Sequence, residues 1–427
     1  MKLVLMIAPY FVPRRRVGAL RPFKFAIHLR KYGYKPVILT IANPGGRLTK
    51  KEIKLLTGIE VIEIASPIDR TENGKKGLKK EGSISGSVLN WIDKQTPLDS
   101  WIYLFQMRYS WILQQIKAVD PDLIWATGDP WSGLWLGEKL ASELHKPFVA
   151  DFRDPWTLAN VNLRKRSVFS SGVDREAEKK VVNNADKLIF TSRLTEQKYA
   201  DHYQLDSDKS STIYNSYDSA LIKPQSDTEW DFELEDDVLN LIFFGKFRRL
   251  SPVNSVANAL KVLKKKYPRE SDYICIHSFG EPDQKNFKTI EDYGLKKNFQ
   301  FHEPVVPENM IPVLKSADIL LLSTDMEREE IIPAKLWDYL SVEKPIFSIA
   351  PNPEVGEIIM KSKAGVQVHP EEKEEIAEIF HSFIQAKRKQ ENLLFAMEED
   401  LPDRKVYESK ETTKQLAAIF DELTSNA

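Results

Sequence analysis

Short apolar runs alternate with longer amphipathic segments along almost the whole chain. The runs span about four to eight residues, and the segments between them repeat apolar positions at helical spacing. Continuous apolar strands separated by helices are typical of parallel strands that are buried on both faces. Right-handed crossovers between such strands produce a doubly wound α/β sheet. The pattern occurs twice, so we expect two sheets of this kind.

The expected elements follow directly from this pattern. The expected strands of the first half are 3–8, 35–41, 61–65, 123–126, 148–151, 187–191 and 211–214. The expected helices there are 21–31, 101–118, 131–144, 175–183 and 194–202. In the second half, strands are expected at 239–244, 273–278, 299–302, 319–323, 345–349 and 366–368. Helices are expected at 256–266, 310–315, 334–341, 355–361 and 372–385, with a last amphipathic helix at 406–426.

An acidic stretch, 223–237, separates the two runs of strands and helices. It holds few aliphatic residues, so we interpret it as a linker between a first domain at 1–222 and a second domain at 238–403. Open α/β sheets bind ligands beyond the carboxyl ends of their strands. We therefore expect the two domains to face a common central cleft that holds the ligand.

The composition narrows the class of protein. The chain has 427 residues, enough for two or three domains. Its 61 basic and 62 acidic residues nearly cancel, which argues against a nucleic-acid binder. The single cysteine, Cys275, cannot form an internal disulfide, so a reducing compartment is expected. Pro9 interrupts the apolar start of the chain, and no run reaches the ~18 residues of a spanning helix. We expect a cytoplasmic protein whose contact with a membrane is at most peripheral.

Two features bear on membrane contact. The segment 67–87 is rich in Gly and Ser and carries four lysines; a solvated loop is the plainer interpretation, and contact with acidic lipid is the alternative. The lysines are Lys75, Lys76, Lys79 and Lys80. The aromatic residues that follow are Trp91, Trp101, Tyr103, Phe105, Tyr109 and Trp111. These aromatic residues are interpreted either as the packed core of a helix or as a peripheral membrane face. The second interpretation predicts that the protein sediments with anionic liposomes and that this depends on the four lysines.

Two segments of the first domain could carry chemistry. The first strand is followed by three arginines and Gly18, which opens a helix; backbone N–H groups at a helix start attract anions, although a simple turn glycine is the alternative. The stretch Asp151-Phe152-Arg153-Asp154-Pro155-Trp156 lies at the carboxyl end of another strand. Unpaired burial of such charges is costly, so these side chains belong to a site or to a structural ion pair between Arg153 and a neighbouring carboxylate. The turn 127–131 follows a neighbouring strand and should line the same cleft.

The second domain repeats this arrangement of strand, glycine and basic residues. Gly245 is followed by Lys246, Arg248 and Arg249 before a helix, which suits a diphosphate; surface arginines on a loop are the alternative. Farther along, Glu330 precedes a helix expected to begin near Pro333, and Lys335 and Asp338 lie within it. Carboxylates accept hydrogen bonds from sugar hydroxyls and a lysine can bind phosphate. Lys335 and Asp338 could equally be an ordinary pair on a helix surface.

Taken together, these motifs resemble the group 1 (family four) retaining glycosyltransferases, which have the GT-B fold. The resemblance covers nearly the whole chain. Its most specific parts are Asp-x-Arg-Asp-Pro-Trp at 151–156 and Pro-Ala-Lys-Leu-Trp-Asp-Tyr-Leu at 333–340, with Ile-Tyr-Asn-Ser-Tyr-Asp at 213–218 in support. The fold implied is two Rossmann-like domains that face a central cleft, with the last helix, 404–427, packing back on the first domain.

The resemblance also implies roles for individual residues. Glu330 matches the acid that contacts the donor sugar, and Asp151 or Asp154 would orient the acceptor. The positions implied to bind the nucleotide-sugar donor are Gly18, Gly245, Arg248, Arg249, Lys335, Asp338, Tyr339, Val305 and Val306. Three departures from the family pattern stand out: Asp338 replaces a glutamate, Ser216 replaces a glycine, and Glu327 and Glu329 lie close to Glu330.

The implied reaction transfers a hexosyl group from a nucleotide sugar to a hydroxyl, with retention at the anomeric carbon. The acceptor would be a cell-surface polysaccharide or a lipid-linked glycan precursor. The family needs no bound metal, and the sequence shows no clustered ligands that suggest one, so we expect no cofactor. Two alternatives stay open: a sugar-nucleotide 2-epimerase of the same fold, which needs no acceptor, and a catalytically silent scaffold that binds a nucleotide sugar.

Overall fold

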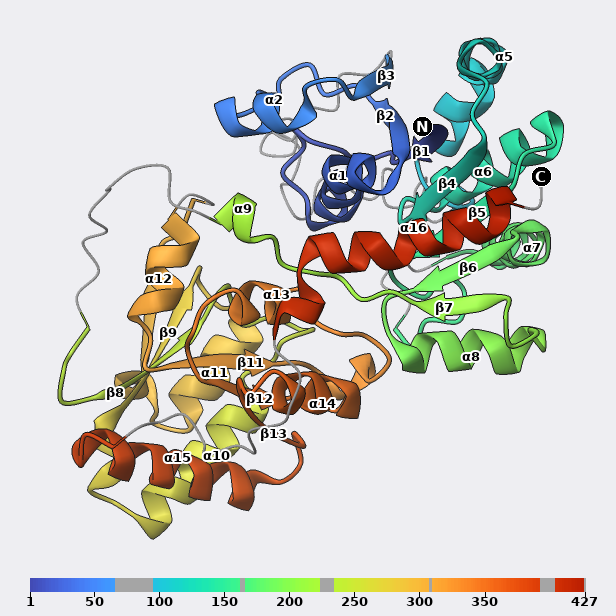
Figure 1. The fold of residues 1–427 in the computed structure, drawn as a ribbon. Coiled ribbons are helices and arrows are strands. Elements are labelled where there is room, and N and C mark those ends of the chain that lie inside the picture. Colours follow the sequence, from blue (N-terminus) through green and yellow to red (C-terminus); the bar gives the residue numbers. More distant parts are fainter. Residues whose placement is uncertain (66–94, 162–165, 223–233, 307–308, 392–403, 426–427) are drawn as a thin grey trace. The chain divides into compact units, whose positions relative to one another are not determined.

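The computed structural model describes residues 1–65, 95–161, 166–222, 234–306, 309–391 and 404–425. It divides into two compact units (Figure 1). The first comprises Met1–Ser216 together with Ser409–Ala427, and the second comprises Tyr217–Glu408. The lysines of 67–87, Trp91 and most of the expected linker lie outside the described residues. Among the residues described, no helix has the length and apolar character needed to span a bilayer.

The first unit is built on a parallel sheet of seven strands in the order β3-β2-β1-β4-β5-β6-β7. The strands are β1 (Lys2–Ile7), β2 (Tyr34–Ile41), β3 (Glu60–Ile64), β4 (Leu123–Gly128), β5 (Phe148–Phe152), β6 (Lys187–Phe190) and β7 (Ser210–Thr212). The helices are α1 (Val17–Leu29), α2 (Lys50–Leu56), α5 (Ile102–Val119), α6 (Trp131–Leu144), α7 (Val168–Asn184), α8 (Arg193–Tyr203) and α16 (Ser409–Ser425).

The second unit repeats this topology with a parallel sheet of six strands in the order β10-β9-β8-β11-β12-β13. The strands are β8 (Leu239–Phe243), β9 (Ile274–Phe279), β10 (Phe299–His302), β11 (Ile319–Ser323), β12 (Ile346–Ile349) and β13 (Gly365–Val368). The helices are α9 (Ser219–Ile222), α10 (Asn254–Lys266), α11 (Gln284–Asp292), α12 (Met310–Ser316), α13 (Lys335–Leu340), α14 (Pro353–Lys361) and α15 (Lys373–Arg388). Helices α10 and α15 lie side by side (Figure 1) and close one hydrophobic core.

The structure confirms the two doubly wound sheets predicted from the sequence. Each expected strand is present, with ends that differ by at most two residues. Apart from the short helix α9, two helices, α2 and α11, were not expected. Thr49 and Glu52 form a capping box at the start of α2, a signal that the sequence contains. Helix α7 begins at Val168 rather than at Arg175, because Ser167 caps it by accepting from the Ser170 amide.

Helix α16 belongs to the first unit although it lies at the other end of the sequence. The Tyr34 hydroxyl donates to Asp421 Oδ1 at 2.6 Å, and the Tyr34 ring lies 5.3 Å from that of Phe420. Lys2 Nζ donates to the Thr424 carbonyl oxygen at 3.0 Å. The start of α16 is held by Ser409, whose Oγ lies 3.1 Å from that of Ser216. The serine at the position where the family has glycine therefore anchors the last helix.

Candidate functional site

The strand order places a topological switch point in the second unit between β8 and β11, where open α/β sheets bind ligands. Tyr339 of α13 connects these two strands through hydrogen bonds. Its hydroxyl donates to the Leu321 carbonyl oxygen at 3.1 Å and accepts from the Phe244 amide at 2.9 Å. The side chain is fully buried. Tyr339 therefore fixes the end of β8 and the turn at Gly245, and this geometry gives it a supporting position rather than an exposed binding one.

Gly245 and Lys335 lie next to each other at this switch point. The φ angle of Gly245 is +126°, in a region that other residues rarely adopt. A Cβ at this position would lie 3.1 Å from the Lys335 amine, so the absence of a side chain leaves room for the lysine. The amine itself lies 3.7 Å from the centroid of the Phe243 ring. Phe243, which we did not predict as a site residue, thus supports Lys335 from β8.

The Lys335 amine is poorly solvated. Its pKa is lowered to about 7, mainly by burial and also by the nearby Arg248 charge, while the Asp338 carboxylate opposes both effects. Arg249 instead pairs with Glu327 at 3.1 Å on the surface. Of the two arginines predicted to bind diphosphate, Arg248 is therefore the one that acts on Lys335. A cation kept from water beside a second cation is well suited to an anionic ligand.

The approach to α13 separates Glu330 from its acidic neighbours. The Glu330 side chain is buried, whereas Glu327 and Glu329 are exposed. Helix α13 begins at Lys335, two residues later than the expected start near Pro333. The Pro333 carbonyl oxygen accepts from the Leu336 amide at 3.0 Å and closes the preceding turn. Half-buried Asp338 follows in the first turn of α13.

A buried polar chain leads to the loop that contains Val305 and Val306. Asn240 Nδ2 donates to the Val238 carbonyl oxygen at 2.8 Å, so its Oδ1 accepts from His277 Nε2 at 3.0 Å. His277 Nδ1 then accepts from His302 Nε2 at 3.0 Å. Burial lowers the pKa of His277 to about 4, so this ring is neutral. Val305 is half-buried and Val306 is 55% exposed, beyond His302 at the end of β10.

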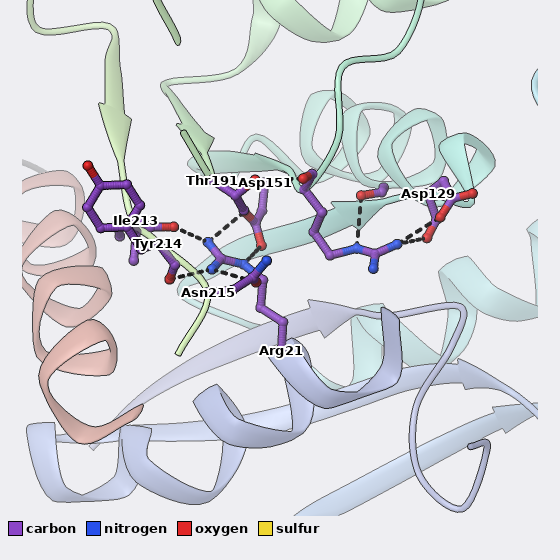
Figure 2. Close-up of polar contacts among 9 residues, drawn as sticks. Arg21, Asp129, Asp151, Thr191, Ile213, Tyr214 and Asn215 are labelled. Atoms are coloured by element: carbon purple, nitrogen blue, oxygen red, sulfur yellow. Dashed lines mark hydrogen bonds and ion pairs between the residues drawn. The ribbon is translucent and has the colours of Figure 1, made fainter. Parts of the chain in front are cut away.

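In the first unit, Asp151 forms a buried ion pair with Arg21 of α1 (Figure 2). Arg21 Nε donates to Asp151 Oδ2 at 2.8 Å and Nη2 donates to Oδ1 at 3.0 Å. The same guanidinium donates to the carbonyl oxygens of Ile213 and Tyr214, which joins β5 to the segment after β7. Asp151 has no exposed surface. Asp151 therefore belongs to a structural ion pair, but its partner is Arg21 and not Arg153, the arginine that the sequence suggested.

Arg21 was not among the predicted residues, although its position carried a signal. Its guanidinium carbon lies 4.7 Å from the centroid of the Phe25 ring, one turn farther along α1. Phe25 in turn packs on Trp125 of β4. Residues four apart share one face of a helix, so Arg21 belongs to the sheet-facing side of α1. A buried guanidinium needs hydrogen-bond acceptors, and a carboxylate is the strongest of these.

Arg153 points toward the start of α1. Its Nε donates to the Gly128 carbonyl oxygen at 3.1 Å, and its Nη2 pairs with Asp129 Oδ1 at 2.8 Å (Figure 2). A Cβ at Gly18 would lie 2.6 Å from Arg153 Nη1. The glycine therefore admits a guanidinium to the first turn of the helix, which adds positive charge where an anion was expected. Asp154 follows Arg153 and is half-buried.

No group of three or more His, Cys, Asp or Glu side chains among the described residues could hold a metal ion. That the reaction needs no metal stays a prediction.

Comparisons with known proteins agree with this arrangement. A model of "Glycosyltransferase Family 4" matches residues 24–221, and a model of "Glycosyl transferases group 1" matches residues 227–394. Between them the two models span most of the chain, which therefore belongs to the group 1 glycosyltransferases. No curated protein matches the sequence significantly.

Solved structures show the same fold at low sequence identity. HepE from Anabaena, solved with UDP, is 15% identical with a TM-score of 0.60, and the match covers 99% of this chain and 100% of HepE. Sucrose-phosphate synthase from Thermosynechococcus elongatus is 12% identical with a TM-score of 0.64 over 100% of both chains. A glycosyltransferase from Rickettsia africae is 14% identical with a TM-score of 0.60, over 100% of this chain and 99% of that one. The chain thus has the GT-B fold.

Proposed function

We propose that this glycosyltransferase moves a hexosyl group from a nucleotide sugar to a hydroxyl of a cell-surface polysaccharide or lipid-linked glycan precursor, with retention of anomeric configuration. The observation that carries the proposal is the cluster of Gly245, Lys335 and Arg248 at the switch point of the second unit. Such a cluster suits the diphosphate of a nucleotide sugar, because the cations can neutralise the charge that develops as the diphosphate leaves. That HepE was solved with UDP and with UDP-glucose supports UDP-glucose as the first donor to test.

The reaction would use the chain's residues as follows. Lys335 and Arg248 hold the diphosphate, Glu330 contacts the donor sugar, and Asp338 accepts from the ribose. The bond between the anomeric carbon and the diphosphate oxygen breaks, and a bond to the acceptor oxygen forms. A phosphate oxygen takes the acceptor proton, while Asp154 orients the acceptor hydroxyl. Positive groups fixed before the reaction lower its barrier because they are stronger partners of the transition state than of the substrate.

Two further loops complete the proposed donor contacts. Val305 and Val306 would receive the base through the backbone of their loop, and Gly18, with Arg153 beside it, would contact the phosphates. Arg249 is tied to Glu327, so we assign it a lesser part than Arg248. Asp151 and Tyr339 would act through the residues that they position.

The pH dependence of donor binding tests the state of Lys335. Without a bound donor, the Lys335 amine has a pKa of about 7. A bound diphosphate favours the charged form of this amine, so the protein takes up a proton when it binds the donor above pH 7. We therefore expect the dissociation constant for UDP-glucose to rise by up to about tenfold per pH unit between pH 7.5 and 9. Calorimetric titration in buffers of different ionisation enthalpy measures this uptake. An affinity that stays constant over this range would contradict it.

The stereochemistry of donor hydrolysis tests retention. With water as the acceptor, we expect slow release of glucose from UDP-glucose, and NMR spectra taken before mutarotation should show the α-anomer first. Because the proposal needs no metal, added EDTA should leave the rate unchanged. Early appearance of the β-anomer would contradict retention. An epimerase would instead yield a new UDP-sugar without release of UDP.

We also propose that the protein is cytoplasmic and contacts an anionic membrane surface through α5. Trp101 and Phe105 lie in the core, as the packing interpretation of the aromatic cluster predicts. Tyr103, Met107 and Trp111, however, are 57%, 64% and 38% exposed, and their spacing of four places them on one face. The helix contains basic but no acidic residues. An exposed apolar face of this kind suits insertion at a lipid headgroup boundary.

Liposome binding tests this contact. We expect Met107→Asp to reduce sedimentation with vesicles of anionic lipid at least fivefold, because the new charge must leave the headgroup boundary. Met360→Asp is the matched control, since Met360 is 49% exposed in the second unit. Equal sedimentation of both variants with the wild type would count against α5 as the contact.

A further inference from the structure

One buried carboxylate of the first unit has no part in the reaction as described above. Glu178 of α7 has no exposed surface. It accepts hydrogen bonds from the Thr157 amide at 3.1 Å, from the Thr157 hydroxyl, from the Tyr199 hydroxyl and from the Tyr203 hydroxyl at 3.2 Å. Burying a carboxylate costs free energy unless hydrogen bonds compensate for the loss of water. A carboxylate with four donors around it therefore fixes the conformation of the groups that donate to it.

Three of these four contacts lead to the turn that carries Asp154. Thr157 is the residue where the turn ends, and it contributes two donors. The Tyr199 hydroxyl, which donates to Glu178, also accepts from the Trp156 amide at 2.8 Å. The backbone that follows Pro155 is thus tied, directly at Thr157 and through Tyr199 at Trp156, to a single carboxylate.

The start of the same turn is held by Thr191, which follows β6, and its end also packs on α6. The Thr191 hydroxyl donates to the Arg153 carbonyl oxygen at 2.6 Å. The Trp156 ring stacks on that of Trp131, with centroids 5.2 Å apart and planes 5° from parallel. Asp154 therefore lies in the middle of a segment that is fixed at each end, with Glu178 as the partner with most contacts.

We propose that Glu178 is a positioning residue for glycosyl transfer, which holds the turn 153–157 so that Asp154 meets the acceptor hydroxyl. This inference rests on the role proposed above for Asp154. Glu178 does not touch the substrate. It acts on the rate because a displacement of about 1 Å in a catalytic group can slow a reaction by about 100-fold.

Three variants separate positioning from general stability. Glu178→Met removes the acceptors at similar volume, and Thr157→Val removes one donor from the turn without a change of shape. Tyr203→Phe is the matched control, because it removes the one contact that does not lead to the turn. We expect kcat for UDP-glucose hydrolysis to fall about 10- to 100-fold in Glu178→Met and severalfold in Thr157→Val, with KM within twofold of the wild type. Tyr203→Phe should keep the wild-type kcat.

Hydrogen exchange provides a readout that does not need activity. In Glu178→Met the amides of Trp156 and Thr157 should exchange at least tenfold faster, while the second unit is unchanged. Exchange and kcat that match the wild type in both Glu178→Met and Thr157→Val would overturn the inference, as would equal loss of kcat in Tyr203→Phe. If Glu178→Met does not fold, the kcat and the hydrogen exchange of Thr157→Val decide whether the inference holds. A wild-type protein without donor hydrolysis would instead count against the proposed function, and the exchange rates would still decide whether Glu178 holds the turn.

Discussion

Replacing Asp151 with alanine is expected to lower the free energy of unfolding of the first unit by about 3–5 kcal/mol. The change leaves Arg21, a residue that is 5% exposed, without the carboxylate that accepts from its Nε and Nη2. A buried charge without a partner costs far more than the pair itself contributes. Urea unfolding followed by tryptophan fluorescence measures the effect, because the first unit contains most of the tryptophans.

Two further variants test whether the buried, unpaired charge of Arg21 causes the loss of stability. Asp129→Ala removes a half-exposed partner of Arg153, whose guanidinium keeps its bonds to the carbonyl oxygens of Gly128 and residue 129, so we expect a smaller loss than in Asp151→Ala. The double variant Arg21→Met with Asp151→Leu should lose less stability than Asp151→Ala alone, since no charge is left buried. A wild-type unfolding midpoint in Asp151→Ala, combined with lost turnover, would show that Asp151 acts on the substrate instead.

Replacing Lys335 with methionine is expected to weaken the binding of UDP-glucose by about 10- to 100-fold, the value of one charge-assisted hydrogen bond in a poorly solvated place. Methionine keeps the contact with the Phe243 ring, so the fold and the melting temperature without ligand should change little. Calorimetric titration measures the affinity. The matched control is Lys265→Met, because Lys265 is exposed near the end of α10. An unchanged affinity in Lys335→Met would show that the diphosphate does not bind at this cluster.

Strand placement could be predicted from the sequence because parallel strands buried on both faces leave a clear signal. The runs at 239–244 and 319–323, for example, correspond to β8 and β11, whose carboxyl ends define the switch point. The position of Gly245 after β8 and of Lys335 after β11 then follows from topology. Their proximity needed no structural information beyond the strand order.

Roles that depend on burial could not be predicted in the same way. A carboxylate at the end of a strand has the same sequence signal whether it faces solvent or a buried cation, so only the structure distinguishes Asp151, paired with Arg21, from half-buried Asp154. The same holds for Tyr339, whose hydroxyl lies between two backbone groups. Among three nearby glutamates, burial singles out Glu330.

The most direct test of the central claim is a thermal-shift screen of the wild type and Lys335→Met against UDP, GDP, ADP, TDP and their common sugar conjugates. A ligand that binds only the folded protein raises the melting temperature by mass action. We expect at least one nucleotide and its sugar conjugate to raise the melting temperature of the wild type, and to do so far less in Lys335→Met. No shift with any of them, or equal shifts in both proteins, would contradict a nucleotide-sugar site at Gly245 and Lys335.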